Sequence, residues 1–184
     1  QARILPIASD EMGSLKAVLE LASQADVIVT LGGASVGERD LVRAVATEAG
    51  LDQAFYKVAM RPGKPLIAGK LNGKAMIGLP GNPVSSMVCG TVFLIPALRV
   101  MLGLGKAQMP REVAALGRDI DRNGSRSHYL RARLTLSDGS LTCTPQRHQD
   151  SSLLSILANS DALLVRDPND PPRKKGEFVE FIRL

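Results

Sequence analysis

The feature that most constrains the fold is a short apolar run that ends in a glycine-rich loop and is followed by a helical pattern. Residues 26–31 read Asp-Val-Ile-Val-Thr-Leu, and two glycines follow. Residues 13–25 before this run and 41–49 after the loop carry apolar side chains at helical spacing. A continuous apolar run between two helices is typical of a buried parallel strand. The first half of the chain is therefore predicted to be an open α/β domain.

Shorter elements are predicted after the second helix. Strands are expected at 56–60, 65–69 and 75–79, and Asn72-Gly73 marks a tight turn between the last two. The prolines and glycine of residues 79–84 open a long apolar helix that reaches about Leu102 and is kinked at Pro96. Because this stretch contains two serines, a threonine and an arginine, it is interpreted as a buried helix and not as a membrane span.

A change in composition follows a linker that contains Gly103, Gly105 and Pro110. Residues 129–136 and 140–144 flank a Ser-Asp-Gly turn, which predicts a hairpin, and residues 177–184 alternate like a terminal strand. The predicted organisation is an α/β domain over 1–105 and a small β domain over 106–184.

Composition narrows the classes of partner. The formal net charge of +5 favours an anionic ligand, but aromatic residues make up only 3% of the chain and tryptophan is absent. Because single-strand nucleic-acid binders need aromatic stacking platforms, nucleic acid is not an expected partner. A membrane is not expected either, because the most apolar stretch contains polar residues and an arginine. Cys89 and Cys143 lie far apart, without metal-ligand spacing. This argues against a structural zinc site or a disulfide scaffold and favours a reducing cytoplasm.

The first candidate site is the loop of residues 32–40, directly after the predicted strand. The small residues Gly32, Gly33 and Gly37 allow backbone N–H groups to approach a phosphate, and Ser35 adds a hydroxyl donor. Asp40, in the first turn of the next helix, is suited to bind magnesium or to cap that helix. The alternative is a simple tight turn.

Two further clusters suit an anion. Lys57, Arg61 and Lys64 lie within eight residues around the bend formed by Pro62 and Gly63, which suits an oxyanion. Exposed solubilising charges would explain the same cluster.

The other cluster, residues 79–86, is a second strand-to-helix junction. Gly81 precedes Asn82, which is placed to cap the helix with Pro83 at its first position, and the N–H groups of 84–86, including that of Ser85, point out of its N-terminus. Capping alone would also explain these residues.

The β domain carries a basic cluster. Arg131 and Arg133 share one face of a strand by the period of two, and Arg126 and Arg147 lie nearby. Each has a plain interpretation as part of a basic surface. His128 is interpreted as a surface residue, and His148 as a hydrogen-bonded turn residue.

Three motifs in this order resemble the MoeA family of molybdopterin molybdenumtransferases, which includes the E domain of gephyrin. They are Thr-Leu-Gly-Gly-Ala-Ser-Val-Gly-Glu-Arg-Asp at 30–40, Met-Arg-Pro-Gly-Lys-Pro at 60–65 and Gly-Leu-Pro-Gly-Asn-Pro-Val-Ser at 78–85. The resemblance extends from about residue 4 to the end and includes Arg131 and His-Gln-Asp-Ser at 148–151.

The resemblance implies a fold and a reaction. The fold is a MogA-like, three-layer α/β domain with a mostly parallel sheet, followed by a small β-barrel-like domain. The implied reaction inserts molybdate into adenylylated molybdopterin and releases AMP, with Mg²⁺ assisting. The family also implies a homodimer and a MogA-type adenylyltransferase as a partner. Family members carry further N-terminal parts, so this chain resembles their C-terminal portion and is expected to be inactive alone.

The resemblance also implies residue roles. Asp40, Lys57 and Arg61 are the implied catalytic residues, and no metal ligand set is assigned. The implied binding residues are glycines or residues with a hydrogen-bonding or cationic side chain, namely Gly32, Gly33, Ser35, Gly37, Lys64, Gly81, Asn82, Ser85, Arg131 and Ser151. Arg61 stands where many members have lysine, which changes the donor geometry. Asp150 replaces a residue that is often glycine.

Two alternatives stay open. A MogA- or MoaB-type molybdopterin adenylyltransferase would use the same α/β domain but would lack residues 111–184. A non-catalytic scaffold of the gephyrin type would bind peptides on the second domain and would keep its partner after Asp40→Ala.

Overall fold

The computed structural model describes residues 1–33, 41–105 and 108–184. The chain divides into two compact units, and each is described by itself. Unit 1 comprises residues 1–58 and 63–81, and unit 2 comprises residues 59–62 and 82–184. The predicted boundary at residue 105 stays a prediction.

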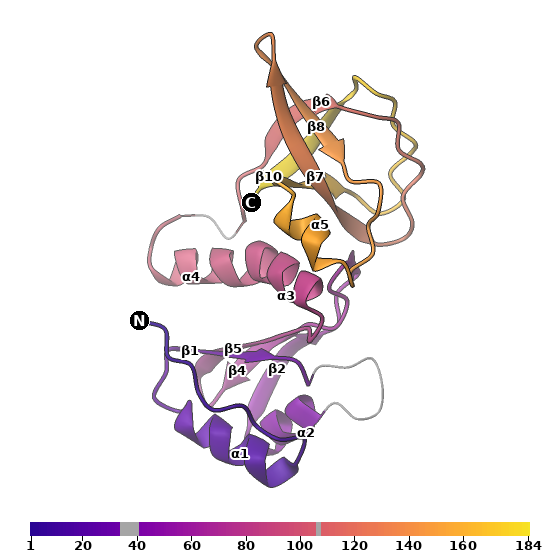
Figure 1. Cartoon of the computed structure of the whole chain (residues 1–184). Helices are drawn as coiled ribbons and strands as arrows, with labels where there is room; N and C mark the ends of the chain where they lie inside the picture. The colour runs from indigo at the N-terminus through magenta and orange to yellow at the C-terminus, as the bar shows by residue number, and fades with distance from the viewer. Residues whose placement is uncertain (34–40, 106–107) are drawn as a thin grey trace. The chain divides into compact units, whose positions relative to one another are not determined.

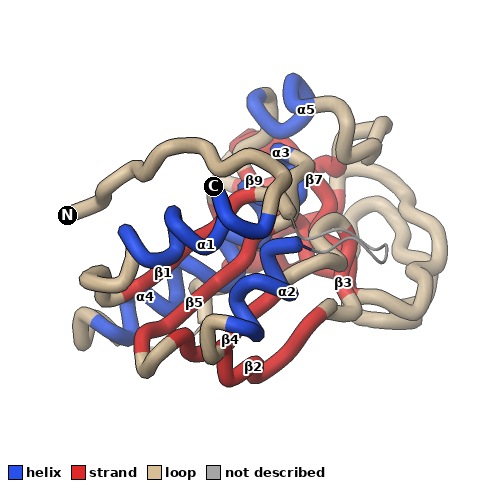
Figure 2. Tube along the Cα trace, turned by 90° about the horizontal axis from the view of Figure 1, so that it is seen from below, coloured by secondary structure: helices blue, strands red, loops and turns tan. Residues whose placement is uncertain are grey.

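Unit 1 is a four-stranded sheet in the order β1-β5-β4-β2 with two helices on one face (Figures 1 and 2). Its elements are α1 (Met12–Leu21), β1 (Val27–Leu31), α2 (Leu41–Glu48), β2 (Leu51–Tyr56), β4 (Ile67–Leu71) and β5 (Lys74–Leu79). Leu19 of α1 and Val45 of α2 pack with Ile28, Ile67 and Met76 of the sheet in one buried cluster. The helical spacing of the apolar residues therefore aims both helices at the same sheet face.

The sheet is mixed, whereas a mostly parallel sheet was expected. Only β1 and β5 are parallel; β5–β4 and β4–β2 are antiparallel. The physical reason lies in the turn between β4 and β5. Asn72 and Gly73 both have positive φ, 49° and 79°, which is the geometry of a two-residue hairpin turn, and such a turn joins antiparallel strands only.

The expected strand at 56–60 was wrong. β2 ends at Tyr56, and the two-residue strand β3 (Met60–Arg61) follows in unit 2. Lys57 has φ 70°, outside the extended region, so the chain turns there instead of continuing the strand.

Unit 2 contains a long helix in three segments and a barrel. The helix consists of α3 (Pro83–Cys89), the π-helical η1 (Gly90–Leu94) and α4 (Ile95–Met101). Pro96 has no N–H and its ring crowds the carbonyl four residues earlier. The π-helical turn accommodates it, since the N–H of Ile95 donates to the carbonyl of Gly90, five residues earlier.

The expectation that this helix is buried holds only for its first segment. Val84, Val88 and Cys89 of α3 are buried, whereas α4 buries Pro96 alone. By length and composition alone, the helix over Pro83–Met101 could cross a membrane, and 28% of its most apolar part is buried in the protein.

The barrel is formed by β6 (Glu112–Leu116), β7 (Ser127–Ser137), β8 (Ser140–Pro145), β9 (Ala162–Arg166) and β10 (Phe178–Arg183), with the short helix α5 (Leu154–Ala158) in the β8–β9 connection. Its strand order is β7-β8-β6-β10-β9, and β7 pairs with β9 to close it. The predicted hairpin is confirmed as β7–β8, with Asp138 and Gly139 between Ser137 and Ser140. β6, β9 and α5 were not predicted.

Alternate residues of these strands fill the barrel. Leu130, Cys143, Leu164 and Phe181 belong to one buried cluster, which also takes in Leu116 of β6. A closed barrel has no free sheet edge, so its backbone donors and acceptors pair within the barrel.

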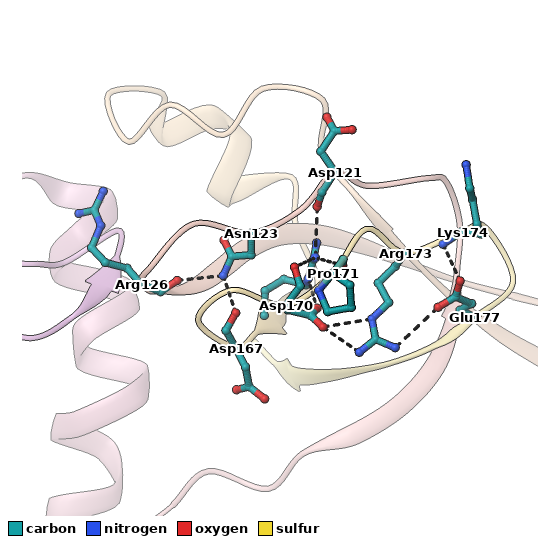
Figure 3. A network of polar contacts seen from close by, with 10 residues as sticks. Asp121, Asn123, Arg126, Asp167, Asp170, Pro171, Arg173, Lys174 and Glu177 are labelled. Atoms are coloured by element: carbon teal, nitrogen blue, oxygen red, sulfur yellow. Dashed lines mark hydrogen bonds and ion pairs between the residues drawn. The ribbon is translucent and has the colours of Figure 1, made fainter.

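A polar network lies among the connections beside β9 (Figure 3). Arg166 is 3% exposed, forms an ion pair with Asp170, and donates to the carbonyl oxygens of Asp121 and Pro171 at 3.2 and 2.8 Å. Arg173 binds the other carboxylate oxygen of Asp170 at 2.8 Å. Asn123 donates to the carbonyls of Arg126 and Asp167. One buried guanidinium thereby ties three separate segments together.

Gly33→Ala should destabilise unit 1. A Cβ at Gly33 would lie 2.1 Å from Cγ2 of Val42, and Gly33 has φ 70°. We expect the free energy of unfolding to fall by about 1–3 kcal/mol in urea titrations. Gly13→Ala is the control, because nothing lies within 4 Å of its Cβ and alanine favours the helix. Equal stability of the two variants would contradict this account.

Arg166→Met should destabilise unit 2. It removes the partner of one Asp170 carboxylate oxygen and of the carbonyls of Asp121, Asp170 and Pro171, and removing one member of a buried pair costs about 3–5 kcal/mol. Arg183→Met removes an exposed ion pair to Glu112 and should lower stability far less, because exposed ion pairs contribute little. Chemical denaturation followed by circular dichroism measures both; similar losses would argue against a structural role for the network.

Candidate functional site

In unit 1 the two glycine motifs meet at one sheet edge. Because β1 and β5 are parallel, their carboxyl ends lie together. The N–H of Gly32 donates to the carbonyl of Leu79 at 3.1 Å, and a Cβ on Gly81 would lie 3.2 Å from the Cα of Gly32. Glycine at both positions permits this approach of two backbones. The edge beyond the carboxyl ends of parallel strands is where α/β sheets bind ligands.

The rest of the first motif cannot be placed. Ser35, Gly37 and Asp40 lie outside the described residues. Their predicted roles stay predictions.

Lys57 and Lys64 of unit 1 are both exposed and lie on the bend that precedes β4. The backbone N–H of Val58 donates to the carbonyl of Lys64 at 3.0 Å, which holds the bend closed. The Nζ of Lys57 lies 4.7 Å from the centre of the Tyr56 ring. Arg43 contacts the same ring at 4.6 Å. Two cations share one ring, so this surface is positive.

In unit 2 Asn82 caps the long helix. Its Oδ1 accepts from the N–H of Ser85 at 3.0 Å, and its carbonyl accepts from the N–H of Ser86 at 2.8 Å. Pro83 occupies the first turn, as predicted. The N–H groups of Ser85 and Ser86 are therefore already bonded to Asn82, although the sequence predicted the N–H groups of residues 84–86 as anion donors. Roles for Asn82 and for Ser85, which is buried, in ligand binding stay predictions.

The barrel unit gathers a second set of basic residues around β7. Strand β3 pairs in parallel with the start of β7, so that Arg61 lies opposite His128. Across the other edge of β7, His128 lies opposite Arg166 of β9. Arg131 lies three residues further along β7, so its side chain leaves the opposite face of the strand from that of His128. Pairing of distant strands thus places two arginines beside one histidine, and the charge of Arg131 acts on it from the other face.

Arg131 is the residue whose state most needs an explanation. Its side chain is 0% exposed, and its Nη2 donates to the carbonyl oxygen of Asp150 at 3.2 Å. Its Nε and Nη1 are buried and have no hydrogen-bond partner among the described residues. Burial first, and then repulsion by Arg61, lowers the pKa of Arg131, while Asp150 opposes this. A buried guanidinium with two unused donors is suited to receive an anion.

The loop after β8 holds Arg131 in place. The side chain of Gln149 accepts from the backbone N–H of Arg131 at 3.0 Å and donates to its carbonyl at 2.9 Å. Arg118 donates to the carbonyls of Pro145 and Gln146 at 2.9 and 2.8 Å. Sequence reasoning missed Gln149 and Arg118 as supports, although Gln149 lies within the segment 148–151 that carries the resemblance.

Asp150 and Ser151 occupy the end of this loop. The carboxylate of Asp150 accepts from the N–H of Ser152 at 2.8 Å. This hydrogen bond, together with the Ser152 side chain, lowers the pKa of Asp150. Ser151 is half-buried and follows the carbonyl that accepts from Arg131. Arg61, Arg131 and Asp150 thus lie close enough for their charges to act on one another, and the predicted binding roles of Arg131 and Ser151 stay predictions.

Two expectations about this strand were wrong. His128 is not a surface residue: it is half-buried, and its Nε2 is buried without a partner among the described residues. Arg131 and Arg133 do not form one basic face, because Arg131 is buried and Arg133 is exposed. The loop of residues 146–151 covers Arg131 but not Arg133, and the alternation of side chains along a strand carries no information about such a loop.

Burial and the positive charges of Arg61, Arg131, Arg166 and Arg126, in that order, lower the pKa of His128 to about 4. The imidazole is therefore neutral at physiological pH. The unfolded chain binds a proton here between about pH 6.5 and about pH 4, whereas the folded chain does not. Stability contributed by this group consequently falls as the pH is lowered through that window.

Within the described residues no group of three or more histidine, cysteine, aspartate or glutamate side chains is placed to hold a metal ion. The acidic residue that the resemblance offers for magnesium, Asp40, lies outside the described residues.

Comparison with known proteins matches this geometry to a family. Residues 2–100 match the family described as "Probable molybdopterin binding domain". This chain belongs to that family. Residues 113–184, which include the barrel strands, match the MoeA C-terminal region, domain IV. The chain thus corresponds to the C-terminal portion of MoeA-family proteins, and the predicted resemblance is confirmed.

Curated relatives and a solved structure agree with this. The chain is 32% identical to the molybdopterin molybdenumtransferase of Bacillus subtilis over 96% of its length, and 31% identical to that of Haemophilus influenzae over 89%. A molybdopterin biosynthesis MoeA protein from Pyrococcus horikoshii aligns over 96% of this chain and 42% of its own, with a TM-score of 0.76 and 29% identity. The chain spans about two-fifths of the length of both curated relatives, 41% in each case.

Arg131→Met should not destabilise the ligand-free protein. Replacing a desolvated charge that leaves two donors unused by an apolar side chain of similar length is commonly neutral or stabilising, by about 1–4 kcal/mol. We expect a gain of about 1–3 kcal/mol in urea titrations without added oxyanion. Arg133→Met, exposed on the same strand, should change stability by no more than about 0.5 kcal/mol. A large loss in Arg131→Met would mean that the guanidinium is already satisfied.

Proposed function

We propose that this chain is part of a molybdopterin molybdenumtransferase and supplies the oxyanion-binding side chains of that enzyme. The observation that supports this most strongly is Arg131, a buried guanidinium whose Nε and Nη1 have no partner among the described residues. Fixed, dry donors interact more strongly with an anion than donors in water do, and they need no reorganisation when it binds. Burying a guanidinium with unpaired donors costs free energy, and a ligand that pairs with these donors would offset that cost.

In the proposed reaction, adenylylated molybdopterin and molybdate give molybdenum cofactor and AMP. Water cleaves the phosphoanhydride that joins the pterin phosphate to AMP, and AMP leaves. The two dithiolene sulfurs replace an oxygen of molybdate, which leaves as water with the two thiol protons. Every species involved is anionic, so the protein's task is to bind, orient and neutralise charge. The net charge of +5 is consistent with that task.

Each predicted residue receives a role in this proposal. Gly33, Ser35 and Gly37 would offer N–H and hydroxyl donors to the pterin phosphate, and Gly32 and Gly81 would let two backbone segments approach each other at that loop. Asn82 would fix the start of its helix, and Ser85 would offer its hydroxyl to the anionic substrate. Lys57, Arg61 and Lys64 would neutralise developing charge. Arg131 and Ser151 would bind molybdate, with Gln149 fixing the position of Arg131. Asp40 would take the catalytic acidic position and contact Mg²⁺, which would stabilise charge on the leaving phosphate.

Two other readings receive less support. An adenylyltransferase of the MogA or MoaB type would have no use for the MoeA C-terminal region at 113–184. A peptide-binding scaffold would have no evident use for a buried guanidinium with unused donors, and would keep its partner after Asp40→Ala.

The setting is proposed from the family. We propose a homodimer that works in the cytoplasm beside a MogA-type adenylyltransferase, with neither nucleic acid nor a membrane as a partner. The α/β domain would span 1–105 and the β domain 106–184. Because the chain spans about two-fifths of its relatives, we expect ligand binding but no robust molybdenum insertion by these 184 residues alone.

Isothermal titration with molybdate, and with sulfate as the control anion, tests the proposal. We expect molybdate-selective heat in the wild type, about a tenfold or greater loss of affinity in Arg61→Ala, and no measurable binding in Arg131→Met, because each truncation removes a charge-assisted hydrogen bond. Arg133→Met should bind as the wild type does. Molybdate heat that survives Arg131→Met would overturn the assigned site, and robust turnover by this chain would overturn the expected dependence on further domains.

A further inference from the structure

His128 occupies a position that the proposed function does not use. It is the middle member of a row across three strands, with Arg61 of β3 opposite it on one side and Arg166 of β9 on the other. Directly opposed residues in a sheet carry their side chains on the same face, with Cβ atoms about 4.5–5.5 Å apart. An imidazole is therefore held between two guanidinium-bearing positions by backbone pairing.

The two flanking arginines are not equivalent. Arg166 is fully engaged, since it binds Asp170 and the carbonyls of Asp121 and Pro171. Arg61 is exposed, and its charge acts on both His128 and Arg131. An anion that reaches Arg61 and Arg131 thus enters the field that His128 experiences.

The imidazole has an unused nitrogen. Nε2 of His128 is buried and has no hydrogen-bond partner among the described residues. Arg61, Arg126, Arg131 and Arg166 all oppose a positive charge on this ring. Among the described residues Asp170 pairs with Arg166 and Arg173, and Asp150 partly offsets Arg131. The pKa of the ring nevertheless falls to about 4, so the ring is neutral at neutral pH in the ligand-free protein.

We propose that an oxyanion bound at Arg61 and Arg131 drives protonation of His128, so that the site takes up its dianion together with one proton. The proton comes from solvent and settles on the imidazole, and no bond of the anion is broken. The negative charge of the bound dianion offsets part of the repulsion that the arginines exert on the ring, so the protonated ring is favoured in the complex. This inference rests on the proposed function and deepens it, because it makes anion affinity depend on pH.

The sign of the dependence follows from linkage. The ligand-free ring is neutral above about pH 4, and the complex holds the proton to a higher pH. Between these two values each unit of acidification strengthens anion binding, by up to about tenfold for one coupled proton. Above the pKa of the ring in the complex, the affinity becomes independent of pH.

The chain contains only two histidines, which makes the test direct. Imidazole NMR signals of the full chain are followed at about pH 6 during titration with molybdate, and the affinity is measured by calorimetry between about pH 6 and pH 8. The expected result is that His128 changes from the neutral to the protonated signal as molybdate binds. Exposed His148 should not respond to the anion.

Two variants separate coupling from binding. His128→Gln keeps a polar side chain that cannot titrate, so its affinity at about pH 8 should match the wild type while the gain toward pH 6 disappears. His148→Gln should keep that gain. Circular dichroism confirms that both variants fold.

The possible outcomes distinguish the two proposals. If molybdate binds the wild type but His128 stays neutral, or if His128→Gln keeps the pH dependence, then the coupling is refuted and the oxyanion site stands. If molybdate gives no heat with the wild type, the proposed function fails for this chain and the coupling fails with it.

Discussion

The pairing of β7 with both β8 and β9 is the constraint on which the rest of the barrel unit depends. It closes the barrel, and it leaves the beginning of β7 free to accept the two residues of β3. Arg61, His128 and Arg166 come from three distant parts of the sequence, and they meet because these pairings fix their register. The same strand carries Arg131, whose burial depends on the loop after β8 folding back over it.

Charge in this unit is distributed between two kinds of arginine. Arg166 has its hydrogen bonds supplied by Asp170 and by backbone carbonyls, so it stabilises the connections at one part of the barrel. Arg131 has two donors left over. Arg166 and Arg131 are thus two buried guanidinium groups on neighbouring strands, and only Arg131 has donors without a hydrogen-bond partner among the described residues. Only the second is explained by a ligand, because its donors otherwise cost free energy without return.

The glycine motifs show a comparable division in the α/β unit. Gly32 and Gly81 are required because two backbone segments cross at the carboxyl ends of β1 and β5. The cap at Asn82 uses N–H groups that a phosphate would otherwise accept from. Part of what looked like anion-binding sequence is therefore structural. The buried basic cluster of the barrel gives the stronger argument for an oxyanion.

The sequence by itself determined the features that depend on neighbours along the chain. It located the two helices and β1 of unit 1, the turns at Asn72-Gly73 and Asp138-Gly139, and the Asn82 cap, and its motifs identified the family. Only the tertiary structure decided the strand order β1-β5-β4-β2, the burial of Arg131 while Arg133 is exposed, and the position of His128 next to Arg61 and Arg166. Turns and caps are set by local backbone chemistry, whereas burial and electrostatic environment arise from strands that pair across long stretches of sequence, and these pairings leave no periodic signal in the residues themselves.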